Sequence, residues 1–275
     1  MSDIFLSIPS GFNIFGWHIN FYGITSALSY LMGVVITCLI AKKRGFKTED
    51  IITLACYVIP MAIIRIYYVL FRLELYTNFW DIFKIWEGGL GFYGGLIGGM
   101  LAVLIYCAIH KKNFFALIDI IAPSLICAQG IGRWGNFFNQ EAFGYYVSNP
   151  NLQWFPFSVY IDSCHQTGCL CGGSGWHLAT FFYESLWNFI TFAVLMLLLY
   201  KVDFKQNGMI ASFYLLLYGI GRMFIEGLRT DSLYLGSIRI SQLLSVIFIF
   251  VGLVSILYYF YKNRKKKDSF DKIMD

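Results

Sequence analysis

Apolar residues occur along this chain in long runs, and short polar segments separate them. A helix that crosses a membrane needs about 20 mostly apolar residues, and lipid offers backbone N–H and C=O groups no partner outside the helix. The pattern therefore predicts an all-α integral membrane protein, one polytopic membrane domain over residues 1–275. The seven predicted spans are 20–40, 51–71, 90–109, 115–133, 178–200, 209–228 and 240–261.

The composition supports a membrane protein. Hydrophobic residues make up 58% of the chain and charged residues 13%, whereas about a quarter of a soluble domain is charged. The net charge of +5 does not indicate nucleic-acid binding, because the basic residues lie between apolar runs and at the C-terminus. No P-loop or zinc-protease motif is apparent. Residues 1–19 contain no Lys or Arg, so they lack the basic start of a signal peptide and are interpreted as a short amphipathic lead-in.

Basic residues between the spans predict the orientation. Within six residues of the ends of the predicted spans, thirteen lie on one side of the predicted bundle and four on the other, and the richer side faces the cytoplasm by the positive-inside rule. The N-terminus is therefore expected outside and the C-terminus in the cytoplasm. The longest loop, 134–177, becomes an extracytoplasmic head loop, and the basic tail 262–275 is expected to contact anionic lipid head groups.

Polar and charged residues cluster first in the stretch Gly130–Gly144, which contains Arg133, Asn136, Asn139 and Glu141. A cation, amides and a carboxylate at the edge of a span are costly unless they have partners or a bound polar group. Its glycines are expected to let the backbone turn sharply and approach a ligand. This stretch is the first candidate site.

The second cluster is a row of polar and charged residues in the sixth predicted span, called the charged stripe below. Tyr218, Arg222, Glu226 and Arg229 are spaced four, four and three apart, which places them on one helix face. An Arg222–Glu226 pair that only holds helices together is one interpretation. The alternative adds Arg133, because three guanidiniums at one depth suit a phosphate, which accepts their forked donors. At that depth the natural phosphate is a phospholipid head group.

Several other positions carry weaker signals. Tyr22 at the start of the first span is either an interfacial anchor or a functional residue. The glycines around Tyr93 at the start of the third span indicate either close helix packing or backbone approach to a head group. Glu184 in the fifth span is expected to be a structural hydrogen-bonding partner.

The seven cysteines form two groups. Cys38, Cys56, Cys107 and Cys127 fall in predicted spans and are expected to behave as small apolar residues. An oxidising exterior favours one disulfide with one cysteine left over in the head loop, ahead of a zinc site. The head-loop cysteines are Cys164, Cys169 and Cys171.

These stretches together resemble the prolipoprotein diacylglyceryl transferase family, integral enzymes of the bacterial cytoplasmic membrane. Residues Gly132–Gly144 match its motif Gly-Arg-x-Gly-Asn-Phe-x-Asn-x-Glu-x-x-Gly. The Tyr-Gly of the first span, the Gly-rich third span, the His…Tyr-Glu opening of the fifth span and the charged stripe also match in order. The resemblance covers nearly the whole chain.

The resemblance implies a definite reaction. Such enzymes transfer the diacylglyceryl group of phosphatidylglycerol to the lipobox cysteine thiol of a prolipoprotein, the first step of bacterial lipoprotein maturation. A thioether forms and glycerol 1-phosphate leaves. The implied partners are phosphatidylglycerol, prolipoprotein signal peptides with a lipobox cysteine and the lipid bilayer, without nucleic acid. The site is expected on the extracytoplasmic side, and neither a metal nor an organic cofactor is expected.

The resemblance and the local chemistry assign residue roles. The expected catalytic residues are Arg133, Arg222, Glu226, Tyr93 and Glu141. The expected phosphatidylglycerol-binding residues are Arg133, Asn136, Asn139, Gly144, Tyr22, Tyr218 and Arg229.

The chain departs from the family pattern in places that bear on mechanism. Tyr93 stands where the family usually has a His that has been considered as the base for the thiol, and Thr230 and Leu178 replace usual prolines. The Cys-rich head loop has no recognised counterpart. The group that accepts the thiol proton therefore stays open among Tyr93, Glu141, Glu226 and His18.

Two other functions use the same residues. A phospholipid or anion transporter would use the arginines only to bind phosphate, but no broken-helix pair or half-repeat supports it. A phospholipid-cleaving hydrolase would need an activated water or a Ser/His pair, and the charged stripe contains no His.

Overall fold

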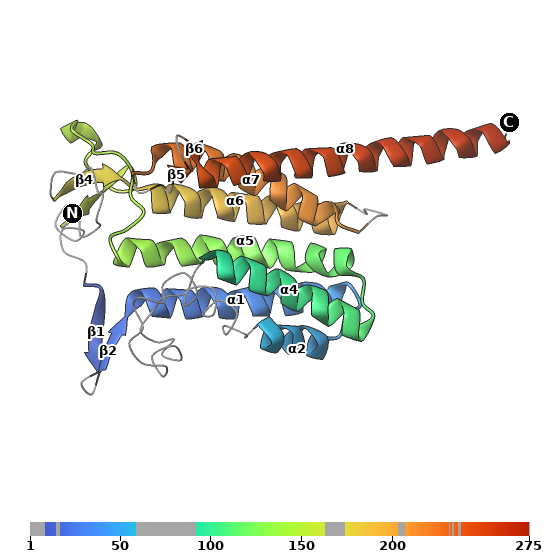
Figure 1. The fold of residues 1–275 in the computed structure, drawn as a ribbon, viewed down its shortest axis with the longest axis horizontal. Coiled ribbons are helices and arrows are strands. Elements are labelled where there is room, and N and C mark those ends of the chain that lie inside the picture. The colour runs from blue at the N-terminus through green and yellow to red at the C-terminus, as the bar shows by residue number, and fades with distance from the viewer. Residues whose placement is uncertain are drawn as a thin grey trace. The chain divides into compact units, whose positions relative to one another are not determined.

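The computed structural model describes residues 9–14, 17–58, 92–162, 174–202, 207–230, 232, 234–235 and 238–274 (Figure 1). For residues 17–18, 54–58, 92–97, 234–235, 238 and 265–274 only the backbone is described. The chain forms two compact units, one of residues Met1–Gly33 with Asp119–Asp275 and one of residues Val34–Ile118.

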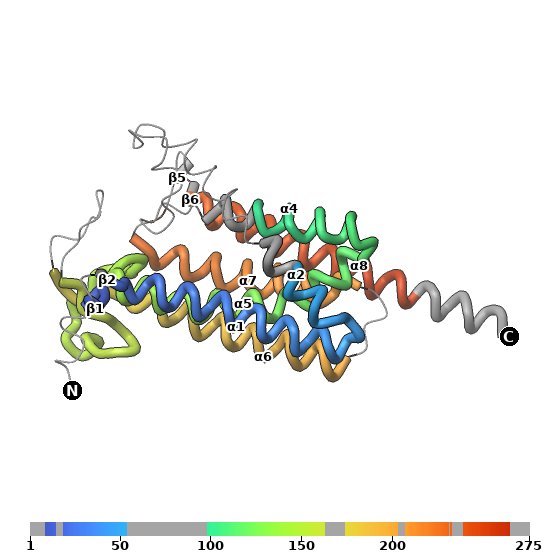
Figure 2. The backbone as a smooth tube through the Cα atoms, turned by 90° about the horizontal axis from the view of Figure 1, so that it is seen from below, coloured from blue at the N-terminus to red at the C-terminus, as the bar shows by residue number. Residues whose placement is uncertain are grey.

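Long apolar helices dominate the first unit. It contains the beginning of α1 (Phe21–Lys43), most of α5 (Phe114–Phe138), and all of α6 (Thr180–Lys201), α7 (Met209–Leu228) and α8 (Ile240–Met274). Helix α7 packs against both α6 and α8, and both views show these helices side by side (Figures 1 and 2). Apolar composition alone does not determine which helices pack together, because helices in lipid associate through close packing and polar contacts.

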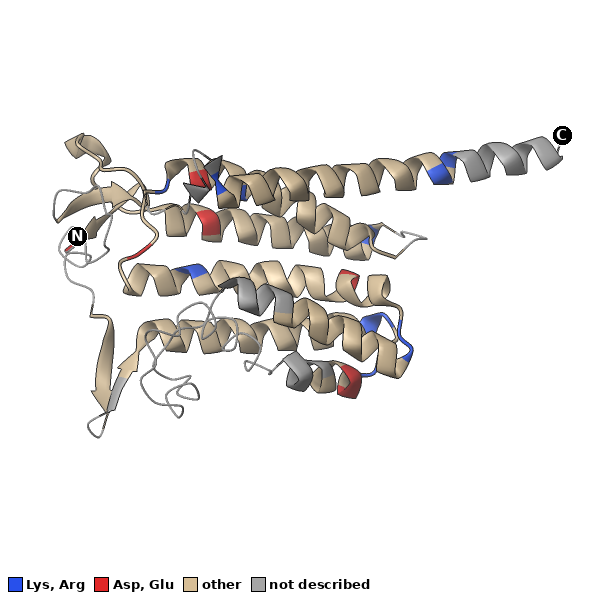
Figure 3. Cartoon of the chain, viewed as in Figure 1, with Lys and Arg blue, Asp and Glu red and all other residues tan. Residues whose placement is uncertain are grey.

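The predicted membrane class is confirmed. Five helices of the described chain are long and apolar enough to cross a bilayer: Phe21–Lys43, Phe114–Phe138, Thr180–Lys201, Met209–Leu228 and Ile240–Arg264. They correspond to the predicted spans one, four, five, six and seven. Figure 3 shows how few charged residues these helices carry, and α8 has none from Ile240 to Tyr261.

The second unit contains α2 (Thr48–Val58) and α4 (Phe92–His110), which pack against each other. An ion pair joins Lys112 Nζ to Asp50 Oδ2 at 2.9 Å. Most of the second predicted span and the start of the third lie outside the described residues.

Short antiparallel strand pairs lie before and between the helices of the first unit. Strands β1 (Gly11–Ile14) and β2 (Trp17–Asn20) form an antiparallel hairpin that leads into α1. Within the expected lead-in, the described residues 11–14 and 17–19 therefore belong to β-strands. A second antiparallel pair, β3 (Ser158–Ile161) and β4 (Gly175–Leu178), lies between α5 and α6, after the short helix η5 (Pro150–Leu152). The pair β5 (Tyr234–Leu235) and β6 (Ile238–Arg239) connects α7 to α8.

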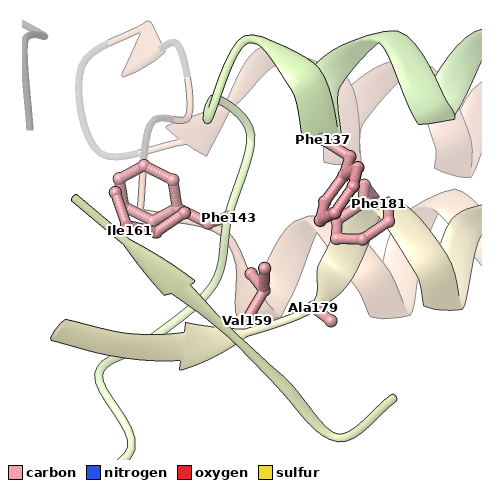
Figure 4. Packing of buried hydrophobic residues seen from close by; sticks show 6 residues of the cluster. All are labelled: Phe137, Phe143, Val159, Ile161, Ala179 and Phe181. Atoms are coloured by element: carbon pink, nitrogen blue, oxygen red, sulfur yellow. The ribbon is translucent and has the colours of Figure 1, made fainter. Parts of the chain in front are cut away.

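The segment between α5 and α6, residues 139–179, is called the head region below. Its β3–β4 pair packs on the end of α5 and the start of α6 around a cluster of buried apolar side chains (Figure 4). Trp134 and Phe182 pack against this cluster. The cluster packs the β3–β4 pair against the helices, and this packing fixes the pair relative to the end of α5 and the start of α6. Its members are Phe137, Phe143, Val159, Ile161, Ala179 and Phe181.

The glycines Gly130, Gly132 and Gly135 lie inside α5, which continues to Phe138. The expectation of a sharp turn at these glycines is therefore wrong, and Gly130 and Gly135 serve close packing instead. A Cβ at Gly135 would lie 2.8 Å from Tyr22 Cδ2, and one at Gly130 would lie 3.2 Å from Phe189 Cε1. The absence of a side chain lets α1 and α6 approach α5 closely.

The cysteines Cys38, Cys107 and Cys127 are free thiols within helices, as the sequence predicted. The side chain of Cys56 and the whole of Cys164, Cys169 and Cys171 lie outside what the structure describes, so the disulfide expected in the head loop stays a prediction.

Candidate active site

Glu184 joins the two arginines that the sequence singled out. It lies in the second turn of α6, and its two carboxylate oxygens face different helices. Oε1 is 2.8 Å from Arg133 Nη2 of α5, and Oε2 accepts a hydrogen bond from Arg222 Nη1 of α7 at 2.9 Å. Guanidiniums from two separate helices thus meet at one carboxylate, and Glu184 is their hydrogen-bonding and ion-pair partner. The predicted contact of these arginines with a lipid phosphate stays a prediction.

Glu226 extends this contact along α7. It follows Arg222 by one helical turn, and its Oε2 lies 2.6 Å from Arg222 Nη2. Arg133, Glu184, Arg222 and Glu226 thus form an alternating ion-pair network with no net formal charge. Glu184 is 3% exposed and Glu226 1%, and carboxylates buried this deeply require paired cations.

Two carboxylate oxygens of the network are held by charge attraction and not by aligned hydrogen bonds. Glu184 Oε1 and Glu226 Oε2 lie at ion-pair distance from the arginines, but neither oxygen has an aligned hydrogen bond from any residue in the described part of the chain. Hydrogen-bond strength falls steeply when the donor is misaligned. The arginine side chains also retain some exposure, 19% for Arg133 and 13% for Arg222. Two guanidiniums held close together and partly accessible are suited to bind a tetrahedral oxyanion.

Tyr218 lies one turn before Arg222 on α7. It is buried and interacts electrostatically with Glu184, Arg133 and Arg222. Its ring stacks on Tyr214 with the centroids 5.6 Å apart, and Gln129 Nε2 of α5 donates to Tyr214 Oη at 3.1 Å. Tyr218 therefore lines the network, as predicted, and α5 and α7 make polar contacts beneath it.

The predicted residues Asn136, Glu141 and Tyr22 gather around the end of α5. Asn136 Nδ2 donates to Glu141 Oε1 at 2.9 Å, and the Glu141 backbone N–H donates to the Asn136 carbonyl at 3.0 Å. Tyr22 of α1 packs at Gly135 and interacts electrostatically with Glu141 and Arg133. The amide and carboxylate of the motif are thus fixed beside Arg133.

Gly144 and Arg229 are joined by the backbone. They form an antiparallel bridge, and the Gly144 N–H donates to the Leu178 carbonyl at 2.9 Å. A Cβ at Gly144 would lie 2.7 Å from Leu178 Cβ and 2.9 Å from the Leu228 carbonyl oxygen. The backbone at Gly144 therefore lies close to Leu178 and Leu228 of the protein itself, whereas the sequence predicted a close approach to a ligand. The bridge anchors Arg229, which interacts electrostatically with Glu184. Arg229 follows the end of α7 at Leu228 in an extended conformation, so the expectation that it lies on the same helix face as Tyr218, Arg222 and Glu226 is wrong.

His177 of β4 supports the same junction. Its Nδ1 lies 3.0 Å from the Gly144 carbonyl oxygen, so Nδ1 carries the proton and donates it. His177 is 1% exposed, and this burial lowers its pKa below the ordinary value, although the hydrogen bond to Gly144 opposes the shift. The ring is therefore neutral at neutral pH.

Sequence reasoning missed Arg239 of β6, which was counted only as a basic residue for orientation. Its guanidinium donates to the Glu226 carbonyl and to Tyr145 Oη, the latter at 3.3 Å. It ties the start of α8 to the end of α7 and to the head region. An arginine directly before an apolar span was the available signal, but such a residue is more often an interfacial anchor.

Other predicted residues are placed less fully. Tyr93 lies in α4 of the second unit, and its side chain is outside what the structure describes. Asn139 follows the end of α5 and is partly buried. The backbone of His18 pairs with Asn13 in the first hairpin.

Comparison with known proteins gives the same family that the motif suggested. A sequence profile described as prolipoprotein diacylglyceryl transferase matches residues 9–258. The chain is 43% identical over 261 residues to phosphatidylglycerol–prolipoprotein diacylglyceryl transferase 1 of Clostridium perfringens (strain 13 / Type A), covering 94% of this chain and 97% of that protein. It is 41% identical to the transferase of Clostridium botulinum (strain Langeland) over 94% of this chain and 98% of that protein. A relative in Limosilactobacillus reuteri (strain DSM 20016) is 39% identical over 89% of this chain and 88% of its own length.

The profile spans all the described helices that build the site, from α1 to the apolar part of α8. With its motif intact from Gly132 to Gly144 and its arginines meeting at Glu184, this chain belongs to the prolipoprotein diacylglyceryl transferase family.

Proposed function

We propose that this protein transfers the diacylglyceryl group of phosphatidylglycerol to the thiol of a lipobox cysteine in a prolipoprotein. The C–O bond to the phosphate breaks, a thioether forms, and glycerol 1-phosphate leaves. The observation that carries the proposal is the pair of guanidiniums, from Arg133 and Arg222, that meet at Glu184. Relatives similar over nearly their whole length bear the names of this activity.

The site provides what this reaction requires electrostatically. Negative charge grows on the phosphate oxygen as it leaves the glycerol carbon, and fixed cations in a site of low dielectric stabilise that charge. Glu184 holds Arg133 and Arg222 in place before lipid arrives, and Glu226 keeps Arg222 oriented. The phosphate then meets guanidiniums that are already oriented, so binding requires little reorganisation. Arg229 contacts the head group or the entrance, and Asn136 and Asn139 position glycerol or phosphate oxygens.

The incoming thiol must lose its proton, because the thiolate is the nucleophile. Of the candidate acceptors with described side chains, Glu226 is bound to an arginine, whereas Glu141 accepts a hydrogen bond from the neutral amide of Asn136. Glu141 is thus not paired with a cation in the ion-pair network, as Glu226 is. Glu141 is therefore the favoured acceptor, with Tyr93 a hydrogen-bonding alternative and His18 a further candidate.

We also propose the orientation and location that the basic residues indicate. The N-terminus lies outside and the C-terminus in the cytoplasm, because thirteen basic residues lie within six residues of the span ends on one side and four on the other. The membrane is the bacterial cytoplasmic membrane, as for the family. Site and head region then face the extracytoplasmic side.

The test is a mass measurement. Purified protein is incubated with phosphatidylglycerol and a lipobox peptide, and the peptide is weighed. Gain of one diacylglyceryl mass is expected, with strong loss in Arg133→Ala and Arg222→Ala and normal activity in Arg264→Ala, an exposed arginine of α8. An unmodified peptide with released glycerol phosphate would show a hydrolase instead. If lipid binds but neither the peptide nor the lipid is chemically changed by the protein or any variant, the result would support a transporter.

A further inference from the structure

Helix α6 carries a buried polar face that continues past the ion-pair network. Glu184, Asn188 and Thr191 follow at spacings of four and three, so they lie on one face. Glu184 is 3% exposed, and Asn188 and Thr191 are each 1% exposed. Polar side chains inside an apolar span are costly and usually mark a bound polar group or an interhelical contact.

Asn188 has no partner for either end of its amide. Its Nδ2 and Oδ1 are both buried, and neither makes a hydrogen bond to any described residue. The neighbouring Ser185 differs, because it accepts from Trp134 Nε1 at 3.2 Å and donates to the Gly130 carbonyl at 2.8 Å. Buried polar groups in native proteins almost always have partners, and an orphaned one calls for a ligand or water.

The position of Asn188 relative to the arginines is defined on both helices that hold it. On α6 it lies one turn beyond Glu184, away from the helix start and towards the apolar middle of the span. On α5 it lies beside Gly130, because a Cβ there would be 3.4 Å from Asn188 Cβ. Gly130 precedes Arg133 by about one turn. Asn188 is thus one turn deeper than the Arg133–Glu184 contact, a rise of about 5.4 Å.

A glycerophospholipid presents its polar groups in a matching order. Its phosphate is outermost, the glycerol carbons follow, and the ester carbonyls come next before the acyl chains. With phosphate at Arg133 and Arg222, an ester carbonyl falls about one helical turn deeper. Ester carbonyls accept hydrogen bonds, and the Asn amide has two N–H donors.

We propose that Asn188 donates a hydrogen bond to an ester carbonyl of the bound diacylglyceryl group. This inference rests on the proposed function and adds a recognition element for the part of the lipid that is transferred. Holding the ester at one depth and the phosphate at the other fixes the glycerol carbon between them, where the thiol attacks. Asn188 is a positioning residue, since it does not contact the reacting atoms.

The test compares phosphatidylglycerol with its diether analogue, which keeps head group and chains but lacks both ester carbonyls. Wild-type protein is expected to use the diether with kcat/KM about five- to tenfold lower, the effect of one neutral hydrogen bond. Asn188→Leu, similar in size, is expected to lose a similar factor on the diester, mainly in KM, and nothing further on the diether. Asn188→Gln, which keeps the donor, is expected to recover part of the preference.

Thr191→Val is the matched control, because Thr191 is equally buried one turn further along the same face. It should keep the wild-type ratio of diester to diether. If Asn188→Leu does not fold, Asn188→Ala gives the same comparison of ratios. An unchanged ratio in a folded Asn188 variant overturns this inference, as does a wild-type enzyme that uses both lipids equally. In either case continued transfer to the peptide would leave the proposed function standing.

Discussion

At the scale of single residues, the site depends on one carboxylate shared by two arginines. Glu184 was recognisable in the sequence as a hydrogen-bonding partner, but its sequence neighbours do not identify what it binds. The structure shows that its two oxygens face α5 and α7. Buried charges of this kind contribute little net stability when paired, but a missing partner is strongly destabilising. Their value here is the orientation of the guanidiniums.

Replacing Arg222 by Lys tests that orientation. The charge is kept, but a lysine cannot contact Glu184 and Glu226 at once through two nitrogens of one planar group. We expect kcat to fall about 10²-fold or more, comparable to losing one donor to a developing oxyanion. Turnover of the lipobox peptide measures it. Arg264→Lys is the control, and near-normal kcat in Arg222→Lys would mean that charge alone suffices.

His177 makes a second residue-scale prediction. Its pKa is lowered by burial, so the unfolded chain takes up a proton at a higher pH than the folded protein does. Stability is therefore complete above about pH 6.5 and decreases as the pH falls below that value. Thermal unfolding in detergent at about pH 7.5 and about pH 5.5 measures the difference. His177→Gln, which does not titrate, should show a smaller decrease; an identical decrease in both proteins would contradict this assignment.

At the scale of elements, helix ends and glycines decide how the spans pack. The residue at the N-cap of α7 is Gly208, which has no side chain to accept a hydrogen bond from the first N–H groups of the helix. Asp119 of α5 supplies the acceptor instead: its carboxylate accepts from the Gly208 N–H at 2.6 Å and the Ala211 N–H at 2.8 Å. An acidic group at a helix N-terminus also interacts favourably with the helix dipole. The cap thus fixes α7 relative to α5, the helices that carry Arg222 and Arg133.

Asp119→Ala is expected to lower stability by about 1–2 kcal/mol, the usual effect of losing an N-cap. Asp119→Asn should lose less, because its amide oxygen still accepts one bond. The melting temperature of the purified protein gives the comparison. Equal stability of wild type and Asp119→Ala would show that the cap has no energetic role.

At the scale of the whole molecule, contacts between distant parts of the chain assemble the site. The bridge between Gly144 and Arg229 joins the motif to the end of α7, and the Gly144 N–H joins it to Leu178. Arg239 adds the start of α8 through Glu226 and Tyr145. Each contact crosses a long sequence separation, so the position of Arg229 depends on the folding of the head region.

Gly144→Ala tests this dependence. The added Cβ meets Leu178 Cβ and the Leu228 carbonyl at distances that force a shift. Overpacking of this kind costs about 1–3 kcal/mol, and the displaced Arg229 should weaken lipid binding, so KM for phosphatidylglycerol should rise. Gly45→Ala is a poor comparison, because its φ is 76°, whereas Gly99 has open space around its Cβ position. Gly99→Ala is therefore the control, and a wild-type KM in Gly144→Ala would contradict the prediction.

The amino-acid sequence by itself determined the membrane class, five of the described spans to within a few residues, and the arginines of the site. Transfer of apolar side chains into lipid depends on local composition, which can be summed along a chain. Only the tertiary structure decided that Gly130, Gly132 and Gly135 are helical, that Glu184 joins Arg133 to Arg222, and that Arg239 reaches the end of α7. It also decided that Asn188 is buried without a hydrogen-bond partner among the described residues. The partner of a polar group inside lipid depends on which helix faces pack together, and that choice is made by shape and by contacts between residues far apart in the chain.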